Sequence, residues 1–499
     1  MRLGCRRVAA TLGLLLTGCT VGPKYETPSV PMTASFKEAT PADYRTAGTW
    51  RPAQPGDRTS RGKWWEIFGD RELDRLEDEL TEANQTLKQS EANFREARAM
   101  VRYQRASLFP TIAGGVSAAS IQDSSNAPYF LIPNPKAEGQ LQLPFDLNYE
   151  VDLWGRIRHT VEAAREEAQA SAGDLATASL SLHAELALDY IDLRSADAQQ
   201  RLLDDTVRAY VDALKLTEDR LKGGYAPVSD VEQAETQLAT TRVEDTDIGV
   251  SRAQYEHAIA VLIGRPPAAF SLPPAPLDLR PLRIPPGIPS VLLQRRPDIA
   301  AAERRVAEAN QQIGIAQAAF YPSMNLSALA GFEGTNLANW FGWPSLFWAV
   351  GTSLTQPLFD GGRIRAQSDQ TRAAYDAYVA IYRQTTLTAF QQVEDNLAAL
   401  RILDTEARQQ REAVEAASRS LRTFTDRYRG GEDAYLLVIT AQTALLLNER
   451  NDVDIERRRM EADILLVKAL GGGWDVGQLP TLKAETSGFP RGAVVPLAQ

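Results

Sequence analysis

Hydrophobic and polar residues alternate along the stretch from residue 141 to residue 153. A period of two over this length predicts a β-strand with two unlike faces. The apolar face comprises Leu141, Leu143, Phe145, Leu147, Tyr149, Val151 and Leu153. The other face comprises Gln142, Pro144, Asp146, Asn148, Glu150 and Asp152. This is the pattern of a strand between lipid and a water-filled lumen, although a strand of a soluble sandwich alternates in the same way.

Three further segments, 112–121, 324–332 and 346–358, favour the membrane interpretation. Each has about the ~9 to 11 residues that a tilted strand needs to cross a bilayer. The apolar sides of the last two are Met324, Leu326, Ala328, Ala330 and Phe332, and Leu346, Trp348, Val350 and Leu354. The loops carry aromatic residues that suit a girdle at the membrane surface, namely Tyr129, Phe130, Trp340, Phe341 and Trp343. The sequence therefore predicts two membrane-length hairpins, 111–153 and 323–359.

Two segments without proline, 156–222 and 363–429, predict helices too long for a compact domain. About 67 residues at 1.5 Å each reach on the order of 100 Å. In the second segment the residues Val393, Leu400, Ala407, Val414, Leu421 and Tyr428 recur every seven positions. The companion positions hold Leu403, Ala417 and Phe424, but also Asn396 and Gln410. This pattern is typical of a coiled coil with one side open to water.

An internal repeat organises the chain. Gly155-Arg156-Ile157-Arg158 recurs as Gly362-Arg363-Ile364-Arg365, Gly223-Gly224 as Gly430-Gly431, and Gly264 as Gly471, all at an offset of 207 residues (362 minus 155). Phe109-Pro110 matches Tyr321-Pro322 at an offset of 212. Each half, 64–265 and 291–472, is expected to run helix, strand, loop, strand, very long helix, Gly-Gly turn, helix. The Pro-rich linker 266–290 between them is expected to be neither helical nor inside a sheet.

The chain begins like a secretory signal peptide. Arg2, Arg6 and Arg7 precede an apolar stretch that ends at Leu16-Thr17-Gly18-Cys19. We predict that residues 1–18 are removed. The ending resembles the lipobox of bacterial lipoproteins, which implies that Cys19 carries a diacylglycerol thioether and an N-acyl chain. Segment 19–63 is then an extended, lipid-anchored segment, and 473–499 is a C-terminal tail. Thr20 in place of Asp resembles the sorting signal for the outer membrane.

The amino-acid composition excludes several kinds of site, partner and membrane segment. Cys5 and Cys19 are the two cysteines, so the mature chain can form no internal disulfide and no thiolate metal site. The net charge of −10 becomes −13 when the three signal arginines are removed, which argues against a nucleic-acid partner. After Cys19 no apolar run approaches the ~18 residues of a membrane helix. A chain of this kind can cross a bilayer as a closed β-barrel.

Four strands per chain cannot close a barrel, so several chains must share one. Two chains would make eight strands, whose interior side chains fill. Three chains would make twelve strands around an open lumen. The sequence therefore predicts a homotrimer, with the long helices continuing the tube and an acidic balance that makes its interior mildly favourable to cations.

The Gly-Gly pairs mark the far ends of the helical hairpins. Gly223-Gly224 and Gly430-Gly431 permit tight reversals at the tips 223–228 and 430–434. After Pro227, Ser229 and Glu232 have the spacing of a capping box that would restart the helix. We expect the tips to be docking points for a partner protein.

These residues resemble the outer-membrane factors of tripartite efflux systems, in the lipoprotein branch with the nodulation-type and multidrug-efflux channels. The matching motifs are Cys19-Thr20-Val21-Gly22-Pro23-Lys24-Tyr25, Trp64-Trp65 with Phe68, Leu73 and Leu76, Arg295-Arg296-Pro297-Asp298-Ile299, Ile313-Gly314 before Phe320-Tyr321-Pro322, and Pro357-Leu358-Phe359-Asp360-Gly361-Gly362-Arg363. The resemblance covers nearly the whole mature chain. It implies an α+β membrane protein, a trimer with a twelve-stranded β-barrel, a twelve-helix periplasmic barrel, and a belt built from the terminal regions and the linker.

The same resemblance implies function and partners. Such a channel is the exit duct that passively conducts drugs or other small molecules. Its partners are a periplasmic adaptor and an inner-membrane pump of the resistance-nodulation-division class. A duct for type I protein secretion shares this fold and remains an alternative.

The family closes its periplasmic mouth with residues beside the second Gly-Gly turn. Arg427 and Tyr428 before the turn, and Leu436 and Thr440 after it, fall at the matching positions. Thr440 stands where the common motif has Asp, so an acidic ring with a cation site is not expected at that level. We instead expect a chiefly apolar gate, built from Leu436 with Leu437 and Val438.

Two other classes of protein, an enzyme and a tethering lipoprotein, explain fewer features of the sequence. An enzyme would have to use His159, His183 or His257, which lie on separate helical stretches without ligand spacing and are expected to be packed or solvated. Neither Gly-rich turn has the Lys and Ser or Thr of a phosphate loop. A coiled-coil lipoprotein that only tethers would explain the helices and Cys19, but not four alternating strands of membrane length.

Overall fold

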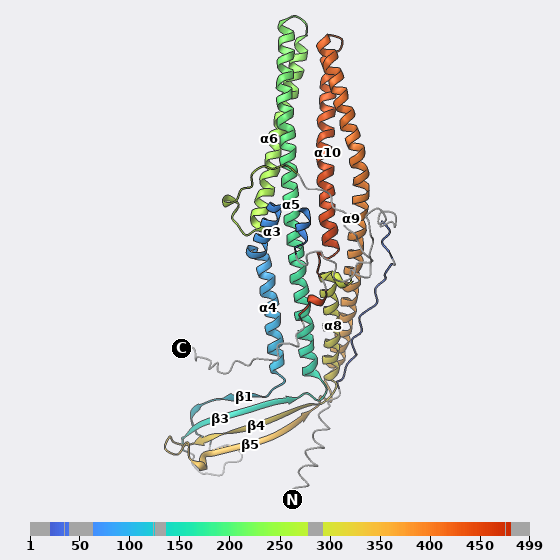
Figure 1. Ribbon diagram of the computed structural model, residues 1–499. Helices are drawn as coiled ribbons and strands as arrows, with labels where there is room; N and C mark the ends of the chain where they lie inside the picture. The colour runs from blue at the N-terminus through green and yellow to red at the C-terminus, as the bar shows by residue number, and fades with distance from the viewer. Residues whose placement is uncertain are drawn as a thin grey trace.

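The computed structural model describes residues 20–33, 35–38, 63–122, 124, 136–277, 293–474 and 476–480. These residues form a long bundle of helices with a β-sheet at one end (Figure 1). The predicted signal segment, Cys19, most of the linker and most of the C-terminal tail lie outside the described residues. No helix of the described part is both long and apolar enough to cross a membrane.

The sheet is antiparallel and contains both predicted hairpins. Its strands are β1 (Thr111–Gly114), β2 (Ser117–Ile121), β3 (Glu138–Val151), β4 (Ser323–Gly334) and β5 (Leu346–Thr355). The order is β1-β3-β4-β5, with β2 also paired to β3. Phe145 pairs with Ala330, which pairs with Trp348, so the predicted apolar sides of three strands share one face. This confirms the alternation as a property of the whole sheet.

The first predicted strand, 112–121, is interrupted in the structure. β1 and β2 both pair with β3 in the same register, and Gly115 and Val116 separate the two short strands. Opposite this gap lies Pro144, which has no backbone N–H and so cannot donate a hydrogen bond to the neighbouring strand. The Gly115 N–H still donates to the Pro144 carbonyl at 3.1 Å, so the strand continues without its full pairing. The last predicted strand ends at Thr355 and not at 358, just before Pro357.

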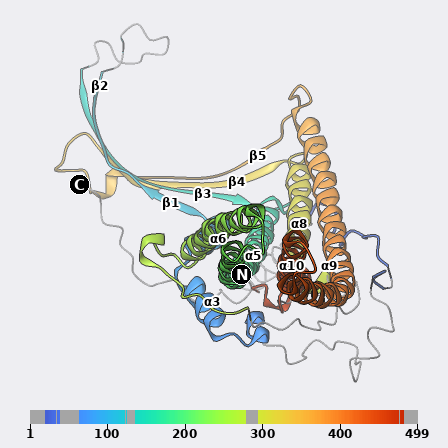
Figure 2. The ribbon, with the colours of Figure 1, turned by 90° about the horizontal axis from the view of Figure 1, so that it is seen from above.

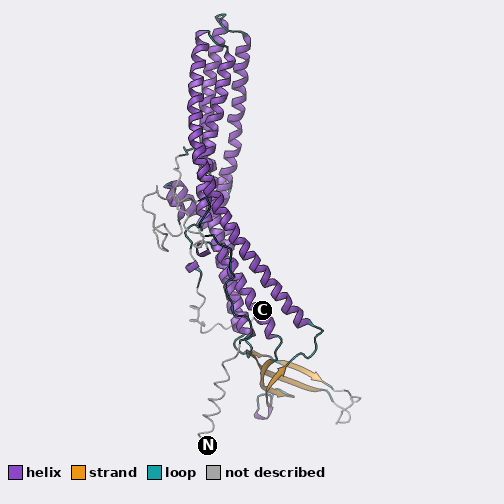
Figure 3. Cartoon of the chain, turned by 90° about the vertical axis from the view of Figure 1, so that its right-hand side faces the viewer, coloured by secondary structure: helices purple, strands orange, loops and turns teal. Residues whose placement is uncertain are grey.

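The helices form two antiparallel hairpins that lie side by side (Figures 1 and 3). The first hairpin is α5 (Arg156–Lys222) with α6 (Val228–Leu262), and the second is α9 (Arg363–Gly430) with α10 (Tyr435–Ala469). The shorter helices α4 (Gln85–Ala106) and α8 (Pro297–Ala318) run from the middle of the bundle toward the sheet. The structure thus confirms both very long helices, and α9 ends one residue later than predicted.

Each Gly-Arg-Ile-Arg motif turns the chain from the sheet into a long helix. Gly155 and Gly362 precede α5 and α9 with φ of 85° and 88°, a left-handed conformation that glycine adopts without strain. Asp152 accepts hydrogen bonds from the N–H groups of Ile157 (3.1 Å) and Arg158 (2.9 Å). Asp360 plays the same part for α9, where it accepts from the Ile364 N–H at 2.9 Å.

The seven-residue pattern in α9 is the contact surface with α10. Val393, Leu403, Ala407 and Tyr428 are all buried. The polar companion residue Gln410 also contacts α10. Its amide nitrogen donates to the backbone carbonyl of Asn448 at 2.8 Å and to the side-chain oxygen of Asn448 at 3.0 Å. The coiled-coil prediction is therefore confirmed, and one of its polar positions is satisfied across the helix pair.

Three local predictions are wrong. One helix is predicted before the first strand, but the structure has η1 (Trp64–Phe68), α3 (Arg71–Ala83) and α4 there. Asn84 caps α4 by accepting a hydrogen bond from the Leu87 N–H at 2.8 Å. The linker contains a short 3-10 turn, η2 (Pro267–Ala269), because proline is tolerated in a first helical turn. Ser229 is not a capping residue, since α6 already starts at Val228 directly after Pro227 and has no side-chain cap. Two more 3-10 turns, η3 (Trp343–Ser345) and η4 (Val476–Gln478), complete the described elements.

The main hydrophobic core lies in the middle of the bundle, where η1 and α3 pack on α5, α6 and α10. Inside it, His183 Nδ1 lies 2.6 Å from the Glu77 carboxyl, and the Trp65 ring stacks on the imidazole at 4.3 Å. Burial raises the pKa of Glu77 well above its usual range and lowers the pKa of His183 to about 4. Burial therefore favours the neutral form of both groups, and His183 is neutral at pH 7.

Because burial favours the neutral pair, Glu77→Gln is expected to cost less than about 1 kcal/mol. Because the pKa of Glu77 is raised, the folded chain keeps a proton that the unfolded chain releases above pH ~4.5. The Glu77 side chain therefore lowers the free energy of unfolding as pH rises. Glu77→Gln should therefore match or exceed the wild type in thermal midpoint at pH 8. The acid-side loss, between pH ~6.5 and ~4, belongs to His183 and should persist in the variant. A buried ion pair would instead lose about 3–5 kcal/mol on this substitution, and that result would contradict the neutral pair.

Candidate gate and docking tips

The two helical hairpins end in tips at the opposite end of the molecule from the sheet (Figure 3). Gly224 and Gly431 have φ of 75° and 80°, so the second glycine of each predicted pair makes the left-handed turn. Gly223 keeps a right-handed conformation, and Gly430 is the last residue of α9. Tyr225, just past the first turn, is 79% exposed at the tip. The prediction that glycine pairs reverse the chain at 223–228 and 430–434 is confirmed.

A small apolar cluster closes the space between the two hairpins near the tips. Tyr428 and Tyr435 are buried and their rings lie 5.1 Å apart. Val438 from α10 and Ala234 from α6 complete the buried part of the cluster. The cluster therefore joins the ends of α9 and α10 to the first hairpin.

Tyr428 also makes polar contacts with the first hairpin. Its hydroxyl donates to Asp230 Oδ2 at 3.2 Å, at the start of α6. The Arg220 guanidinium, from the end of α5, lies 4.7 Å above the Tyr428 ring. Arg220 also donates to the Arg429 carbonyl at 2.9 Å. We call Tyr428, Asp230 and Arg220 the tip latch, because their contacts join the two hairpins at the tips.

The two buried tyrosines of the cluster keep their hydroxyl protons across the physiological range. Burial, with the Asp230 charge beside it, raises the pKa of Tyr428 to about 12. Burial likewise raises the pKa of Tyr435 to about 12. The Tyr428 hydroxyl is therefore a donor at any pH near neutrality.

The other predicted gate residues do not gather around Tyr428. Arg427 lies within its own turn, where its Nε is 2.8 Å from Asp433. Leu436 is 57% exposed, and the Thr440 hydroxyl donates to the Leu436 carbonyl at 2.8 Å. Val438, expected beside Leu436 in the gate, is instead buried in the cluster, because it lies on the face of α10 that packs on the first hairpin.

Sequence reasoning missed Arg220, Asp230 and Tyr435. A signal was present in the seven-residue pattern, whose last member is Tyr428. A tyrosine at a buried coiled-coil position needs a partner for its hydroxyl, and charged residues near the opposite tip are the groups within reach. Asp230 and Arg220 meet that condition, but only the folded hairpins show which carboxylate is used.

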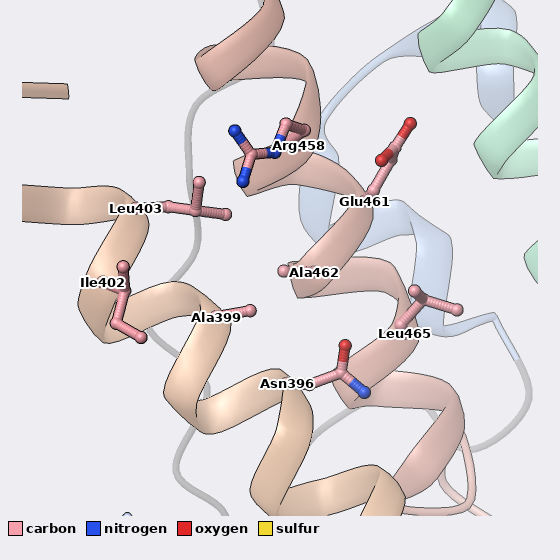
Figure 4. A pocket seen from close by; sticks show the side chains of 8 residues that line it. All are labelled: Asn396, Ala399, Ile402, Leu403, Arg458, Glu461, Ala462 and Leu465. Atoms are coloured by element: carbon pink, nitrogen blue, oxygen red, sulfur yellow. The ribbon is translucent and has the colours of Figure 1, made fainter. Parts of the chain in front are cut away.

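A groove of about 320 Å³ lies between α9 and α10 in the middle of the bundle (Figure 4). Asn396, Ala399, Ile402 and Leu403 line it from α9, and Arg458, Glu461, Ala462 and Leu465 line it from α10. Ile402 and Leu465 are both partly open to solvent. Nearer the sheet, Phe36 of the N-terminal segment packs against Val393 of α9 and Leu466 of α10. Arg458 and Glu461 are the charged residues that line the groove.

The comparisons with known proteins agree with this architecture. The model of the outer membrane efflux protein family matches residues 76–265 and 288–472, which is most of the chain. The chain belongs to the outer membrane efflux protein family. The two matched ranges cover both helical hairpins and both strand pairs, so the tip latch lies inside the family's shared region.

Curated relatives are similar over nearly their whole length. The toluene efflux pump outer membrane protein TtgF of Pseudomonas putida is 32% identical over 471 residues, 94% of this chain and 97% of that protein. Outer membrane protein OprJ of Pseudomonas aeruginosa is 32% identical over 475 residues, 94% of this chain and 96% of that protein. This efflux protein is accordingly an outer-membrane channel component of an efflux pump.

Solved structures share the fold. The outer-membrane channel OprN superimposes with a TM-score of 0.82 at 29% identity, over 91% of this chain and 100% of that one. The Campylobacter jejuni CmeC outer membrane channel has a TM-score of 0.85 over 92% of this chain and 96% of that one. At 23% identity, the CmeC likeness supports the fold alone.

The three histidines of this efflux protein have separate surroundings. His159 Nδ1 lies 2.6 Å from Gln311, and its Nε2 lies 3.0 Å from the Val21 carbonyl. His183 belongs to the core pair, and His257 is exposed on α6. Among the described residues, no group of three or more His, Cys, Asp and Glu side chains is arranged to hold a metal ion. The imidazoles of His159 and His183 are packed, in agreement with their prediction as structural residues.

Proposed function

We propose that three copies of this chain form one continuous export duct, with a twelve-stranded β-barrel in the outer membrane and a twelve-helix barrel in the periplasm. The observation that carries the proposal is a sheet with one exposed apolar face, joined end-on to two very long helical hairpins. The sheet has two outer strands, β1 with β2 on one side and β5 on the other. Outer strands with unpaired backbone groups need partners, and a neighbouring copy supplies them at both edges.

The exposed apolar face is the lipid-facing surface of the proposed barrel. Its large exposed side chains all share the face defined by the register, and they are Ile112, Val116, Phe145, Leu326, Leu346, Trp348, Val350 and Leu354. The opposite face carries polar groups, including Asp146, Asn148 and Glu150 on β3. An apolar exterior around a polar interior is what a water-filled membrane barrel requires. Trp343 and Phe341, in the loop between β4 and β5, suit the aromatic girdle.

The N-terminal segment supports a lipid anchor at Cys19, which itself lies outside the described residues. Thr20 lies close against Gly155, where the sheet meets α5, and the Val21 N–H donates to the Trp154 carbonyl at 3.1 Å. Farther along, the Asn310 amide donates to the Pro23 carbonyl at 3.0 Å. A lipid on the residue before Thr20 would enter the membrane at the level where the proposed barrel begins.

The anchor is tested by replacing Cys19 with serine. The Cys19→Ser protein should lose metabolic labelling by radioactive palmitate completely, because serine offers no thiol for the diacylglycerol. Cys5→Ser is the matched control, since it removes the other cysteine and should leave the label unchanged. Label retained in Cys19→Ser would exclude this residue as the anchor.

The tips form the proposed periplasmic mouth, and two sets of residues close it. The tip latch holds the second hairpin of each chain against the first. Leu436 and Leu437 remain exposed beside it and supply the apolar constriction that we propose to meet at the channel axis. Opening then requires the hairpins to separate, which breaks the Tyr428–Asp230 hydrogen bond.

The apolar constriction is tested with Leu436→Ser. The substitution removes apolar surface at the mouth, so it should raise channel conductance and the entry of large antibiotics into cells. Leu447→Ser, on the same helix but farther from the tip, removes an equally exposed leucine (58%) and should have no effect. Equal conductance for both variants and the wild type would refute the role of Leu436.

The tips also carry the proposed docking surface for a periplasmic adaptor and, through it, an inner-membrane pump of the resistance-nodulation-division class. Tyr225 and Val228 are exposed apolar side chains in this region, next to Gly223-Gly224. Exposed apolar groups at the end of a bundle suit contact with other helices. Efflux is favoured over protein secretion because the relative TtgF is an outer membrane protein of a toluene efflux pump.

A further inference from the structure

Four arginines follow one side of α4, the helix that leads to β1 (Figure 1). Arg95, Arg98, Arg102 and Arg105 are spaced three and four residues apart, which places them along one side of a helix. Arg95 and Arg102 are exposed, and Arg98 and Arg105 are half-buried. In the described part of the chain, no carboxylate lies at ion-pair distance from Arg95, Arg102 or Arg105. We call the four residues the arginine stripe.

The equivalent helix in the second half of the chain carries no such stripe. At the offset of 212 residues, the bounds of α4 (Gln85–Ala106) become those of α8 (Pro297–Ala318). The basic residues Arg304 and Arg305 of α8 form ion pairs with Glu166 and Asp174 of α5. The positions equivalent to the stripe hold uncharged residues, namely Ala307, Asn310, Gly314 and Gln317. The row of unpaired charge is therefore a feature of α4 alone.

The N-terminal segment covers the equivalent side of α8. The Asn310 amide donates to the Pro23 carbonyl at 3.0 Å, and a side chain at Gly22 would lie 3.0 Å from the Gly314 Cα. The described residues of this segment run beside α8 and α9, on the side of the bundle away from α6 (Figures 1 and 2). Because the segment carries the proposed lipid, this side of α8 faces the outside of the duct, where the membrane lies.

The repeat places the arginine stripe on the outside of the duct as well. In the proposed trimer, the two halves of each chain repeat around one axis, so equivalent sides of α4 and α8 face the same way from that axis. α4 itself packs mainly on α5. The stripe side of α4 therefore faces outward at the level where the N-terminal segment leads toward the membrane.

The stripe also reaches the membrane surface. Arg102 lies four residues (106 minus 102) before the end of α4, which is about 6 Å along the helix axis, and Arg105 lies closer still. β1 begins shortly afterwards, at Thr111. The headgroup layer of a bilayer is roughly 5–8 Å thick. Arg102 and Arg105 are thus at the level of the lipid headgroups if the sheet lies in the hydrocarbon layer.

We propose that the arginine stripe binds the phosphate groups of anionic phospholipids in the periplasmic leaflet of the outer membrane. Arg102 and Arg105 contact the phosphates, because a planar guanidinium can donate two parallel hydrogen bonds to one phosphate. Arg98 and Arg95 lie deeper in the periplasm and extend the attraction over about one Debye length, ~8 Å. This inference rests on the proposed function, which places the sheet in the membrane.

The stripe gives the first half of the chain a membrane contact of its own. The second half is held at the membrane by the N-terminal segment and its proposed lipid, which lie on α8. The first half has no such segment on α4, and ionic contacts with headgroups take its place. Each chain is then held at one depth in the membrane on both of its halves.

The test is native mass spectrometry of the purified trimer with added phosphatidylglycerol, or with phosphatidylcholine of the same acyl chains. The wild type should retain phosphatidylglycerol in preference to phosphatidylcholine. One arginine near an anionic surface contributes about fivefold in affinity, so Arg102→Gln with Arg105→Gln should bind phosphatidylglycerol on the order of thirtyfold more weakly. The variant with lysine at both positions keeps the charge and should retain most of the binding.

The matched control removes two other arginines from the same surface charge. Arg201 on α5 and Arg242 on α6 are both exposed and lie away from the sheet. The double variant Arg201→Gln with Arg242→Gln should bind phosphatidylglycerol like the wild type. If the double variant of the stripe yields no folded protein, Arg102→Gln and Arg105→Gln are measured singly, and each should weaken binding about fivefold.

Three results would overturn this inference and leave the proposed function intact. The first is a stripe variant that binds phosphatidylglycerol as tightly as the wild-type trimer does. The second is displacement of the lipid by inorganic phosphate at the same concentration, which would make the stripe a site for free anions. The third is a stripe variant that dissociates into single chains, which would assign the arginines to a neighbouring copy. A wild-type protein with the mass of one chain would overturn the proposed function itself.

Discussion

Tyr428→Phe is expected to shift the duct strongly toward its open state. The substitution keeps the aromatic ring and its packing on Tyr435, and it removes only the hydroxyl that donates to Asp230 at 3.2 Å. A hydrogen bond of this kind contributes about 1 kcal/mol. With one bond in each of three chains, the closed state loses about 3 kcal/mol, which is on the order of a hundredfold in the open-to-closed ratio.

The measurement is the conductance of single channels in planar bilayers, together with the sensitivity of cells to large antibiotics. Tyr210→Phe is the matched control. Tyr210 is equally buried and its hydroxyl lies 3.5 Å from Gln237, but both residues belong to the first hairpin. Tyr210→Phe should therefore behave like the wild type. If the two variants show the same conductance, the hydrogen bond between the hairpins has no part in gating.

Val350→Lys is expected to prevent stable assembly in the outer membrane. Val350 lies in the middle of β5 on the exposed apolar face, paired with Ala328. A lysine at the middle of the bilayer on the lipid side costs about 2–4 kcal/mol, and a trimer has three of them. Heat-resistant trimers should be lost from outer-membrane fractions.

Ser353→Lys is the control on the same strand. Ser353 is exposed on the opposite face, where it pairs with Asn325. A lysine there would face water in the proposed lumen, so trimers should remain and only the ion selectivity should shift toward anions. Loss of trimers in both variants, or in neither, would contradict the assignment of the two faces.

The periodic parts of the fold could be predicted from the sequence because each has a strong local signal. Alternation along 141–153 predicted a strand with an apolar and a polar face, and the register extends those faces across β4 and β5. The absence of proline predicted α5 and α9 almost to the residue. The offset of 207 residues also recurs in the structure, since α6 starts at Val228 and α10 at Tyr435.

The features that the sequence did not predict depend on contacts between segments that are distant along the chain. The break between β1 and β2 comes from Pro144 on another strand, which no pattern within 112–121 could reveal. Val438 looks like a companion of Leu436 in the sequence, but the packing of α10 on the first hairpin buries it. Asp230 becomes a partner of Tyr428 only when two hairpins almost two hundred residues apart meet.

The central claim is that three copies of this chain form one conducting duct. The most direct test is planar-bilayer recording on purified protein whose native mass has been determined in the same detergent. We predict a mass of three chains and discrete steps of current, larger in Tyr428→Phe than in the wild type. A monomer, or a trimer that passes no current even with Tyr428→Phe, would contradict the account.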